Sequence, residues 1–161
     1  MGSEPRPLLF VYRSDFETKH GHHLTKDGRD NEAGLGYWHE PDPNGLFMQC
    51  CQQRGLPDAC LRHCTYNTFT KESLTRMYFK HDACPVQASA EIQFCAAQGR
   101  DHRECCQRNG VATTLAGLKC LTFCDQRPGN VTMLDMSYVP CYDRFENMKA
   151  CFWHDTVYRL K

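Results

Sequence analysis

The sequence lacks any long apolar run, any excess of charge of one sign, and any cysteine before position 50. A membrane-spanning helix needs about 20 consecutive apolar residues, and the run Leu8-Leu9-Phe10-Val11 is too short even for the apolar core of a signal peptide. The 19 acidic and 19 basic residues cancel, whereas nucleic-acid binders and polybasic membrane-surface proteins carry clustered Lys and Arg. We therefore expect no nucleic-acid partner and no membrane insertion in this chain.

All 12 cysteines lie between Cys50 and Cys151, where they make up about 12% of the residues, above the roughly 8–10% typical of secreted disulfide scaffolds. So many thiols would be a liability in a reducing cytosol. The expected location is therefore secreted or extracellular, with Met1-Gly2-Ser3 standing in place of a signal peptide. Residues 1–44 contain no cysteine and have several turn signals. They are predicted to be an N-terminal extension that is partly ordered at best.

The cysteines fall into two sets of six with the same order: CC-x8-C-x3-C-x19-C-x10-C, then CC-x13-C-x3-C-x16-C-x9-C. This predicts a domain of residues 45–155 made of two repeat units, at about residues 46–98 and 101–155, followed by a C-terminal tail of residues 156–161. Six is an even number, so each unit can close three bridges by itself, although bridges between the units are an alternative. The residues predicted to form disulfides are Cys50, Cys51, Cys60, Cys64, Cys84, Cys95, Cys105, Cys106, Cys120, Cys124, Cys141 and Cys151.

The predicted fold class is all-α, a small disulfide-rich domain of short cross-linked helices. Residues 71–80 carry an apolar stripe at helical spacing, and residues 89–98 are good helix formers followed by Gly99, a typical helix end. Asp101-x-x-Glu104 and Asp143-x-x-Glu146 resemble capping boxes, which predicts that helices begin there.

Two spacings of the cysteines bear on how the helices are joined. Neighbouring cysteines on a helix point about 100° apart, so each double cysteine is expected to bridge to two different elements. The pairs Cys60/Cys64 and Cys120/Cys124 are four residues apart and should face the same way on one short helix. Residues 8–12 are a β-prone run that can pair as a strand or hairpin.

Metal binding and hydrolysis are the alternatives to a disulfide framework. Cys60-x3-Cys64 with His63 resembles a zinc half-site, but zinc sites use tighter CxxC pairs, and none occurs here. The histidines His20, His22 and His23 are expected to bind metals only adventitiously. We predict no metal site and no cofactor.

Secreted phospholipases have a His-Asp pair shortly after a double cysteine. His81-Asp82 and His154-Asp155 do not follow one, so we predict no catalytic residue and no enzyme activity.

Asn130-Val131-Thr132 is an N-glycosylation acceptor after the turn signal Arg127-Pro128-Gly129. Asn130 is therefore the predicted glycosylation site.

The cysteine pattern, from Phe47-Met48-Gln49-Cys50-Cys51 through Val139-Pro140-Cys141 to Cys151, resembles the DB module over about residues 46–155. That family is a twelve-cysteine extracellular domain, known chiefly from nematodes and other invertebrates. The resemblance implies six disulfides and a secreted protein or receptor-like ectodomain, often beside immunoglobulin-like or fibronectin type III domains. It carries over no catalytic residue.

The predicted function is recognition of another secreted or cell-surface protein by a rigid surface. A free signalling ligand or antagonist is the first alternative, and a secreted hydrolase is the second. Aromatic and arginine side chains are enriched at interface hot spots. The candidate contact residues of these types are Tyr66, Phe69, Arg103, Arg127, Tyr142 and Trp153.

Overall fold

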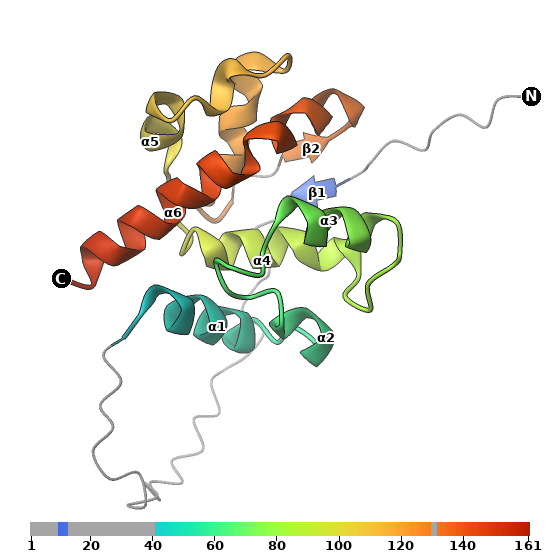
Figure 1. Cartoon of the computed structure of the whole chain (residues 1–161), viewed down its shortest axis with the longest axis vertical. Helices are drawn as coiled ribbons and strands as arrows, with labels where there is room; N and C mark the ends of the chain where they lie inside the picture. The colour runs from blue at the N-terminus through green and yellow to red at the C-terminus, as the bar shows by residue number, and fades with distance from the viewer. Residues whose placement is uncertain (1–9, 13–40, 130–131) are drawn as a thin grey trace, which may run out of the picture.

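The computed structural model describes residues 10–12, 41–129 and 132–161, and short helices form most of its regular structure (Figure 1). The predicted helical, disulfide-rich fold class is therefore confirmed, with one small two-stranded sheet added. In chain order the elements are β1 (Phe10–Tyr12), α1 (Pro43–Gln53), α2 (Asp58–Leu61), α3 (Lys71–Tyr78), the 3₁₀-helix η1 (Val86–Ala88), α4 (Ser89–Ala96), α5 (Arg103–Arg108), the 3₁₀-helices η2 (Val111–Thr113) and η3 (Gly117–Cys124), β2 (Thr132–Leu134), the 3₁₀-helix η4 (Met136–Arg144) and α6 (Phe145–Arg159).

The helix starts are set by side chains other than the predicted ones. Asp42 caps α1, and Thr70 forms a capping box with Ser73 at the start of α3. The capping boxes predicted at Asp101 and Asp143 are wrong. Asp101 accepts hydrogen bonds from Arg103 in a tight turn, and Asp143 pairs with a lysine of the other unit. These stronger charged partners take up both carboxylates, and α5 and α6 start without a side-chain cap.

The twelve cysteines form six disulfides, and the two units pair them in the same way. Numbered one to six within each unit, the bridges join the first to the sixth, the second to the fourth and the third to the fifth cysteine. No bridge crosses between the units, so this alternative is not realised. The bridges are Cys50–Cys95, Cys51–Cys64 and Cys60–Cys84 in the first unit, and Cys105–Cys151, Cys106–Cys124 and Cys120–Cys141 in the second.

The local geometry around the cysteines is only partly helical. Each double cysteine does bridge to two different elements, as predicted from the helix geometry. The prediction that Cys60 and Cys64 share a helix is wrong, because α2 ends at Leu61. Cys120 and Cys124 share η3, a tighter 3₁₀-helix of about three residues per turn, and they bridge to two different elements.

The duplication extends to side chains beyond the cysteines. Three residues after the second cysteine stands Arg54 in the first unit and Asn109 in the second. Four residues before the sixth cysteine stand Glu91 and Asn147. Arg54 Nε donates to Glu91 at 2.6 Å, and the Asn109 and Asn147 side chains donate to each other's backbone carbonyl oxygens at 2.9 and 3.0 Å. In both units, therefore, these two positions join the helix that carries the double cysteine to the helix that carries the sixth cysteine.

The last helix, α6, holds the two units together. It lies between the rest of the second unit and helix α4 of the first, as Figure 1 shows. Lys149 on α6 donates to the Phe69 carbonyl oxygen at 2.9 Å, and Thr156 Oγ1 lies 3.2 Å from the Tyr66 hydroxyl. The predicted tail at residues 156–161 is therefore wrong in its first part, because α6 continues to Arg159 and buries Thr156.

A short antiparallel ribbon connects the N-terminal region to the second unit. Phe10 pairs with Leu134 and Tyr12 with Thr132. The β-prone run in residues 8–12 was thus predicted from the sequence, while its partner strand was not.

Candidate functional site

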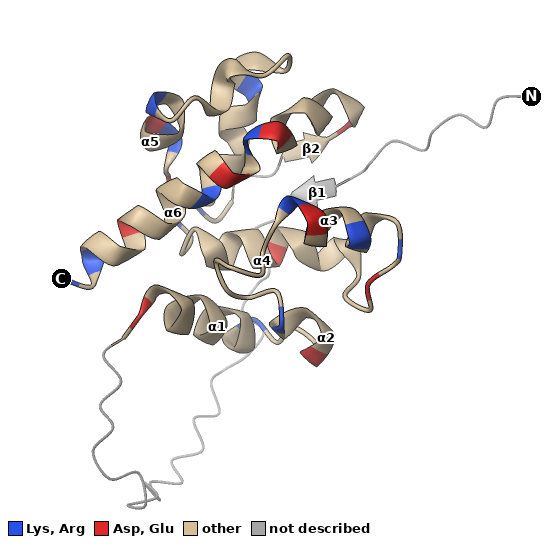
Figure 2. Cartoon of the chain, viewed as in Figure 1, with Lys and Arg blue, Asp and Glu red and all other residues tan. Residues whose placement is uncertain are grey.

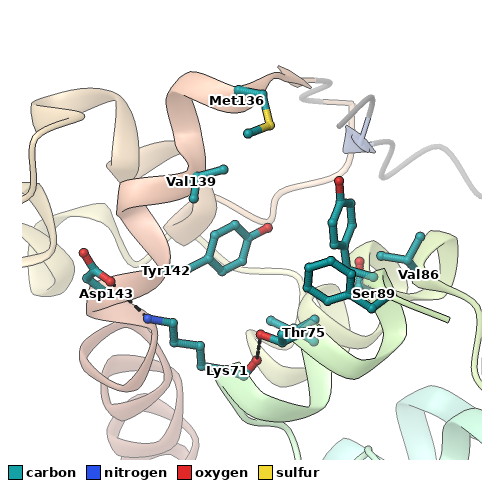
Figure 3. Close-up of a pocket in the computed structure, with 11 residues that line it drawn as sticks. Lys71, Thr75, Val86, Ser89, Met136, Val139, Tyr142 and Asp143 are labelled. Atoms are coloured by element: carbon teal, nitrogen blue, oxygen red, sulfur yellow. Dashed lines mark hydrogen bonds and ion pairs between the residues drawn. The ribbon is translucent and has the colours of Figure 1, made fainter. Parts of the chain in front are cut away.

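An apolar cleft of about 290 Å³ opens between the two units. One wall comes from α3, the loop after it, η1 and the start of α4, and the other comes from η4. Figure 3 shows the side chains of the two walls facing each other across the opening. The lining residues are Lys71, Leu74, Thr75, Tyr78, Phe79, Val86, Ser89, Met136, Val139, Tyr142 and Asp143.

Each wall is anchored to its own unit by a disulfide. Cys60–Cys84 ties the segment between α3 and η1 back to α2. Cys120–Cys141 ties η4 back to η3. Lys71 Nζ and Asp143 Oδ1 then pair across the units at 3.0 Å, at the edge of the cleft (Figure 3). The cleft is therefore a property of the assembled pair of units.

Four apolar side chains of the cleft are unusually open to solvent. Tyr78, Phe79, Met136 and Val139 are between 39% and 60% exposed. Scattered exposed apolar residues are ordinary in soluble proteins, whereas their grouping in one hollow marks a binding surface. The clustering, more than any single residue, singles out this site.

Tyr142 forms part of the cleft and packs against its own unit, the second. Its ring centroid lies 5.6 Å from that of Phe123, and burial raises the pKa of its hydroxyl to about 12. The hydroxyl therefore stays neutral at physiological pH. Neither histidine nor cysteine is found among the described residues that line the cleft. This lining suits the binding of an apolar group.

The structure tests the six candidate contact residues one by one. Tyr66 and Phe69 are buried core residues, so their prediction as surface contacts is wrong. Tyr66 packs edge-on against Phe47 of its own unit, and Phe69 packs edge-on against Phe145 of the second unit. Tyr142 lines the cleft.

The other three candidates lie outside the cleft. Arg103 and Arg127 make charge-assisted, two-pronged hydrogen bonds to Asp101 and Asp125. These two turns lie side by side, joined by a bridge between the two aspartates. Trp153 is 38% exposed on α6 and stays a prediction.

The zinc alternative at Cys60-x3-Cys64 is wrong, because both sulfur atoms are in disulfides with other partners. His63 is buried, and its Nε2 lies 3.2 Å from Asp82 Oδ1. Within the described ranges, no three His, Cys, Asp or Glu side chains are grouped as metal ligands. In that same part of the chain, no helix is long and apolar enough to cross a membrane.

Two predictions fall on residues that the structure does not describe. The glycosylation acceptor Asn130 and the histidines His20, His22 and His23 lie outside the described ranges. Both stay predictions.

The cleft itself was not predicted from the sequence. The apolar stripe predicted in residues 71–80 consists of Leu74, Met77 and Tyr78. Only Met77 is fully buried, whereas Leu74 and Tyr78 line the cleft. The three consecutive apolar residues Met77, Tyr78 and Phe79 at the end of α3 were an available signal. A helical stripe at i, i+3 and i+4 includes two neighbouring positions but not three.

A duplicated, disulfide-locked helical module with an exposed apolar cleft between its halves defines the class of this protein. The sequence profile of the DB module family matches residues 50–152, and the chain belongs to this family. The resemblance stated from the cysteine pattern is therefore confirmed.

Two curated relatives match about half of the chain. They are the Ig-like and fibronectin type-III domain-containing proteins 1 and 2 of Caenorhabditis elegans, each 30% identical over 79 residues, or 49% of this chain. The matched region is 6% of the first relative and 4% of the second. No solved structure matches the chain.

Proposed function

We propose that this DB module is an extracellular recognition module that binds a secreted or cell-surface protein through the cleft between its two units. The exposed apolar cleft with disulfide-anchored walls is the observation that carries the proposal. The partner is expected to insert one or two apolar or aromatic side chains, because a cleft of about 290 Å³ is too small to hold more.

The composition of the cleft supports a protein partner. Aromatic residues and methionine are enriched at protein interfaces, and both types line this cleft. Covering them removes apolar surface from water at about 25 cal/mol per Å². The anchored walls reduce the ordering that binding requires, which favours affinity.

The relatives support the extracellular setting. Their names place immunoglobulin-like and fibronectin type III domains in the same chains as the region that this protein resembles. Secretion, and the absence of catalysis, are parts of the proposal. Figure 2 shows Lys and Arg interspersed with Asp and Glu over the described segments, which fits a partner chosen by shape and apolar contact more than by net charge.

The experiment is a binding screen of the purified protein against a panel of secreted and cell-surface domains, followed by variants of the cleft. Phe79→Ser removes an exposed aromatic ring from the cleft, and Leu115→Ser removes an apolar side chain that is 99% exposed and lies outside it. We expect Phe79→Ser to weaken binding by about tenfold or more. Leu115→Ser should leave binding unchanged.

Thermal unfolding of both variants should match the parent protein, because neither side chain is buried. A panel in which no domain binds contradicts recognition. A partner that binds Phe79→Ser and Leu115→Ser equally well contradicts the cleft as the binding surface. Turnover of an ester, phospholipid or glycoside substrate would favour the hydrolase alternative.

A further inference from the structure

A second hollow, of about 620 Å³, lies in the first unit and shares no lining residue with the cleft. Every residue that lines it is polar or charged. Arg62, Arg76 and His81 contribute positive or titratable groups, and Asn67, Thr68 and Thr70 contribute amide and hydroxyl groups.

Both arginines lie next to one buried carboxylate. The Asp82 side chain is only 5% exposed, and its Oδ1 accepts hydrogen bonds from Arg62 Nη2 at 2.7 Å and from the Cys84 backbone N–H at 2.9 Å. Arg76 Nε lies 4.0 Å from Asp82 Oδ2. Cys84 is in turn fixed by its disulfide to Cys60. Asp82 thus fixes the Arg62 guanidinium group by a hydrogen bond and lies at ion-pair distance from that of Arg76, beside the same hollow.

The charges of the hollow do not cancel. Each guanidinium group has five N–H donors, and Asp82 uses one donor of Arg62 and attracts Arg76 from 4.0 Å. Both arginine side chains remain about half exposed, at 56% and 54%. The hollow therefore keeps one excess positive charge and several unused donors, a combination that favours an oxyanion.

The wholly polar lining is specific to the first unit. Two residues before the fourth cysteine stands Arg62 in the first unit and Thr122 in the second. Three residues before the fifth cysteine stand His81 and Tyr138. Thr122 and Tyr138 also line a hollow, which contains charged side chains as well as the apolar Leu118 and Leu121. The charged residues are Arg103, Lys119 and Asp125. The duplicated position is thus a hollow in both units, and only the first unit lines it without apolar residues.

We propose that the hollow of the first unit binds the sulfate groups of an extracellular polysaccharide. The two guanidinium groups bind the sulfate oxygens, while the Asn67 amide and the threonine hydroxyls pair with the hydroxyl groups of the sugar. An acidic peptide fits less well, because the hollow offers no apolar side chain to anchor one.

The experiment titrates the protein with a heparin-derived tetrasaccharide and, in a parallel arm, with a hyaluronan tetrasaccharide that carries carboxylates but no sulfate. Inorganic sulfate is a third arm. Calorimetry is run at about 0.1 M ionic strength and repeated at about 0.5 M, where exposed charges are screened over a shorter distance. We expect the sulfated tetrasaccharide to bind most tightly and to bind more weakly at the higher salt concentration.

The variants distinguish binding in the hollow from attraction to positive charge elsewhere on the surface. Arg62→Gln with Arg76→Gln removes both guanidinium groups, and Arg108→Gln with Arg159→Gln removes two exposed positive charges elsewhere. The first pair should weaken binding by about tenfold or more, since hydrogen bonds to charged groups are lost. The second pair should change it less than twofold. Arg76→Lys should show an intermediate loss of affinity, because lysine keeps the positive charge but cannot donate two parallel hydrogen bonds as a guanidinium group does.

Equal affinity in the two double variants would overturn the proposal, provided that thermal unfolding shows both are folded. So would the absence of binding to the sulfated tetrasaccharide at millimolar concentration. Binding of inorganic sulfate alone would identify a free-anion site. Tighter binding of an acidic peptide than of the tetrasaccharide would replace the sugar by a protein partner.

Discussion

Asp82 shows how one buried carboxylate organises its surroundings. Burial alone would raise the pKa of Asp82, but hydrogen bonds from the Cys84 N–H, Arg62 and His63 together hold this pKa well below its ordinary value. The carboxylate is therefore charged in the folded protein over the whole physiological pH range. Its contribution to stability should depend on pH in a defined direction.

The first prediction concerns this pH dependence. The folded pKa of Asp82 lies below the unfolded value of about 3.9. Its contribution is thus fully present above that value and is lost as pH falls below it, because the unfolded state then binds more protons. Asp82→Asn should lower the free energy of unfolding by about 1–3 kcal/mol at neutral pH. It should also reduce the loss of stability between about pH 5 and pH 2.

Denaturant unfolding at a series of pH values, with disulfides intact, measures both effects. Asp143→Asn is the matched control, because that carboxylate is 68% exposed and makes only a surface ion pair. An unchanged pH slope in Asp82→Asn would contradict the assigned hydrogen bonds.

The equivalent pairs Arg54–Glu91 and Asn109–Asn147 perform one task with different chemistry. The ion pair is largely buried, and Arg54 also lies 4.1 Å above the Phe94 ring. Its Nη2 is buried without a hydrogen-bond partner among the described residues. The first unit therefore buries two charged groups at positions where the second unit has two neutral amides.

The second prediction exploits this difference. Arg54→Asn or Glu91→Asn alone leaves one charge buried and unpaired, and each should destabilise the fold by about 3 kcal/mol. The double variant can form the amide pair of the second unit, so its destabilisation should be less than the sum by about 1 kcal/mol or more. A double-mutant cycle in denaturant gives the coupling. Arg108→Asn, which breaks an exposed pair with Glu104, should cost less than about 0.5 kcal/mol.

At the scale of elements, the helix ends follow from backbone conformation. Gly99 lies in the left-handed region at φ +65°, after α4, and a Cβ there would stand 2.9 Å from the Phe94 ring. Gly55 has nearly the same φ, +69°, after α1, and a Cβ there would meet nothing within 4 Å. The two glycines therefore share a backbone requirement and differ in available space.

The third prediction follows from this comparison. Gly55→Ala should destabilise the protein by about 1 kcal/mol, the cost of a left-handed alanine. Gly99→Ala should destabilise it by about 1 kcal/mol more, because the methyl group displaces the Phe94 ring from Arg54. Denaturant midpoints of the two variants give the difference directly. Equal midpoints would show that the ring moves without cost.

The elements that the sequence predicted best are those set by local chemistry. The helices of residues 71–80 and 89–98 and the glycine ends were recognised, because spacing and left-handed glycine act within one or two turns. The capping boxes at Asp101 and Asp143 were wrong because Asp101 accepts hydrogen bonds from Arg103, and Asp143 pairs with Lys71 of the other unit.

The candidate site could not be predicted for a related reason. The sequence identified aromatic residues of the right type, but Phe69 is buried and Phe79 is exposed. Phe69 and Phe79 are ten residues apart in the sequence, and nothing in that spacing shows which of the two is buried. The difference arises because α6 of the second unit covers Phe69, while η4 stands across an open cleft from Phe79.

At the scale of the whole molecule, two units with no disulfide between them are packed through buried polar contacts. Tyr66 donates to the Ala96 carbonyl oxygen at 2.6 Å and lies beside Thr156 of α6, and burial raises the pKa of its hydroxyl to about 12. Lys149 reaches from the second unit to a carbonyl of the first. The cleft depends on this packing, because the disulfides fix each wall only to its own unit.

The final prediction tests that separation. Trypsin can cleave after Arg100 and after Arg103, between the last cysteine of the first unit and the first of the second. Digestion of the denatured protein without reduction should therefore give two disulfide-linked groups of peptides. One should hold the six cysteines from Cys50 to Cys95, and the other the six from Cys105 to Cys151. Mass spectrometry before and after reduction identifies them. A single linked group containing all twelve cysteines would show that a bridge crosses between the units and would contradict the paired connectivity on which the cleft rests.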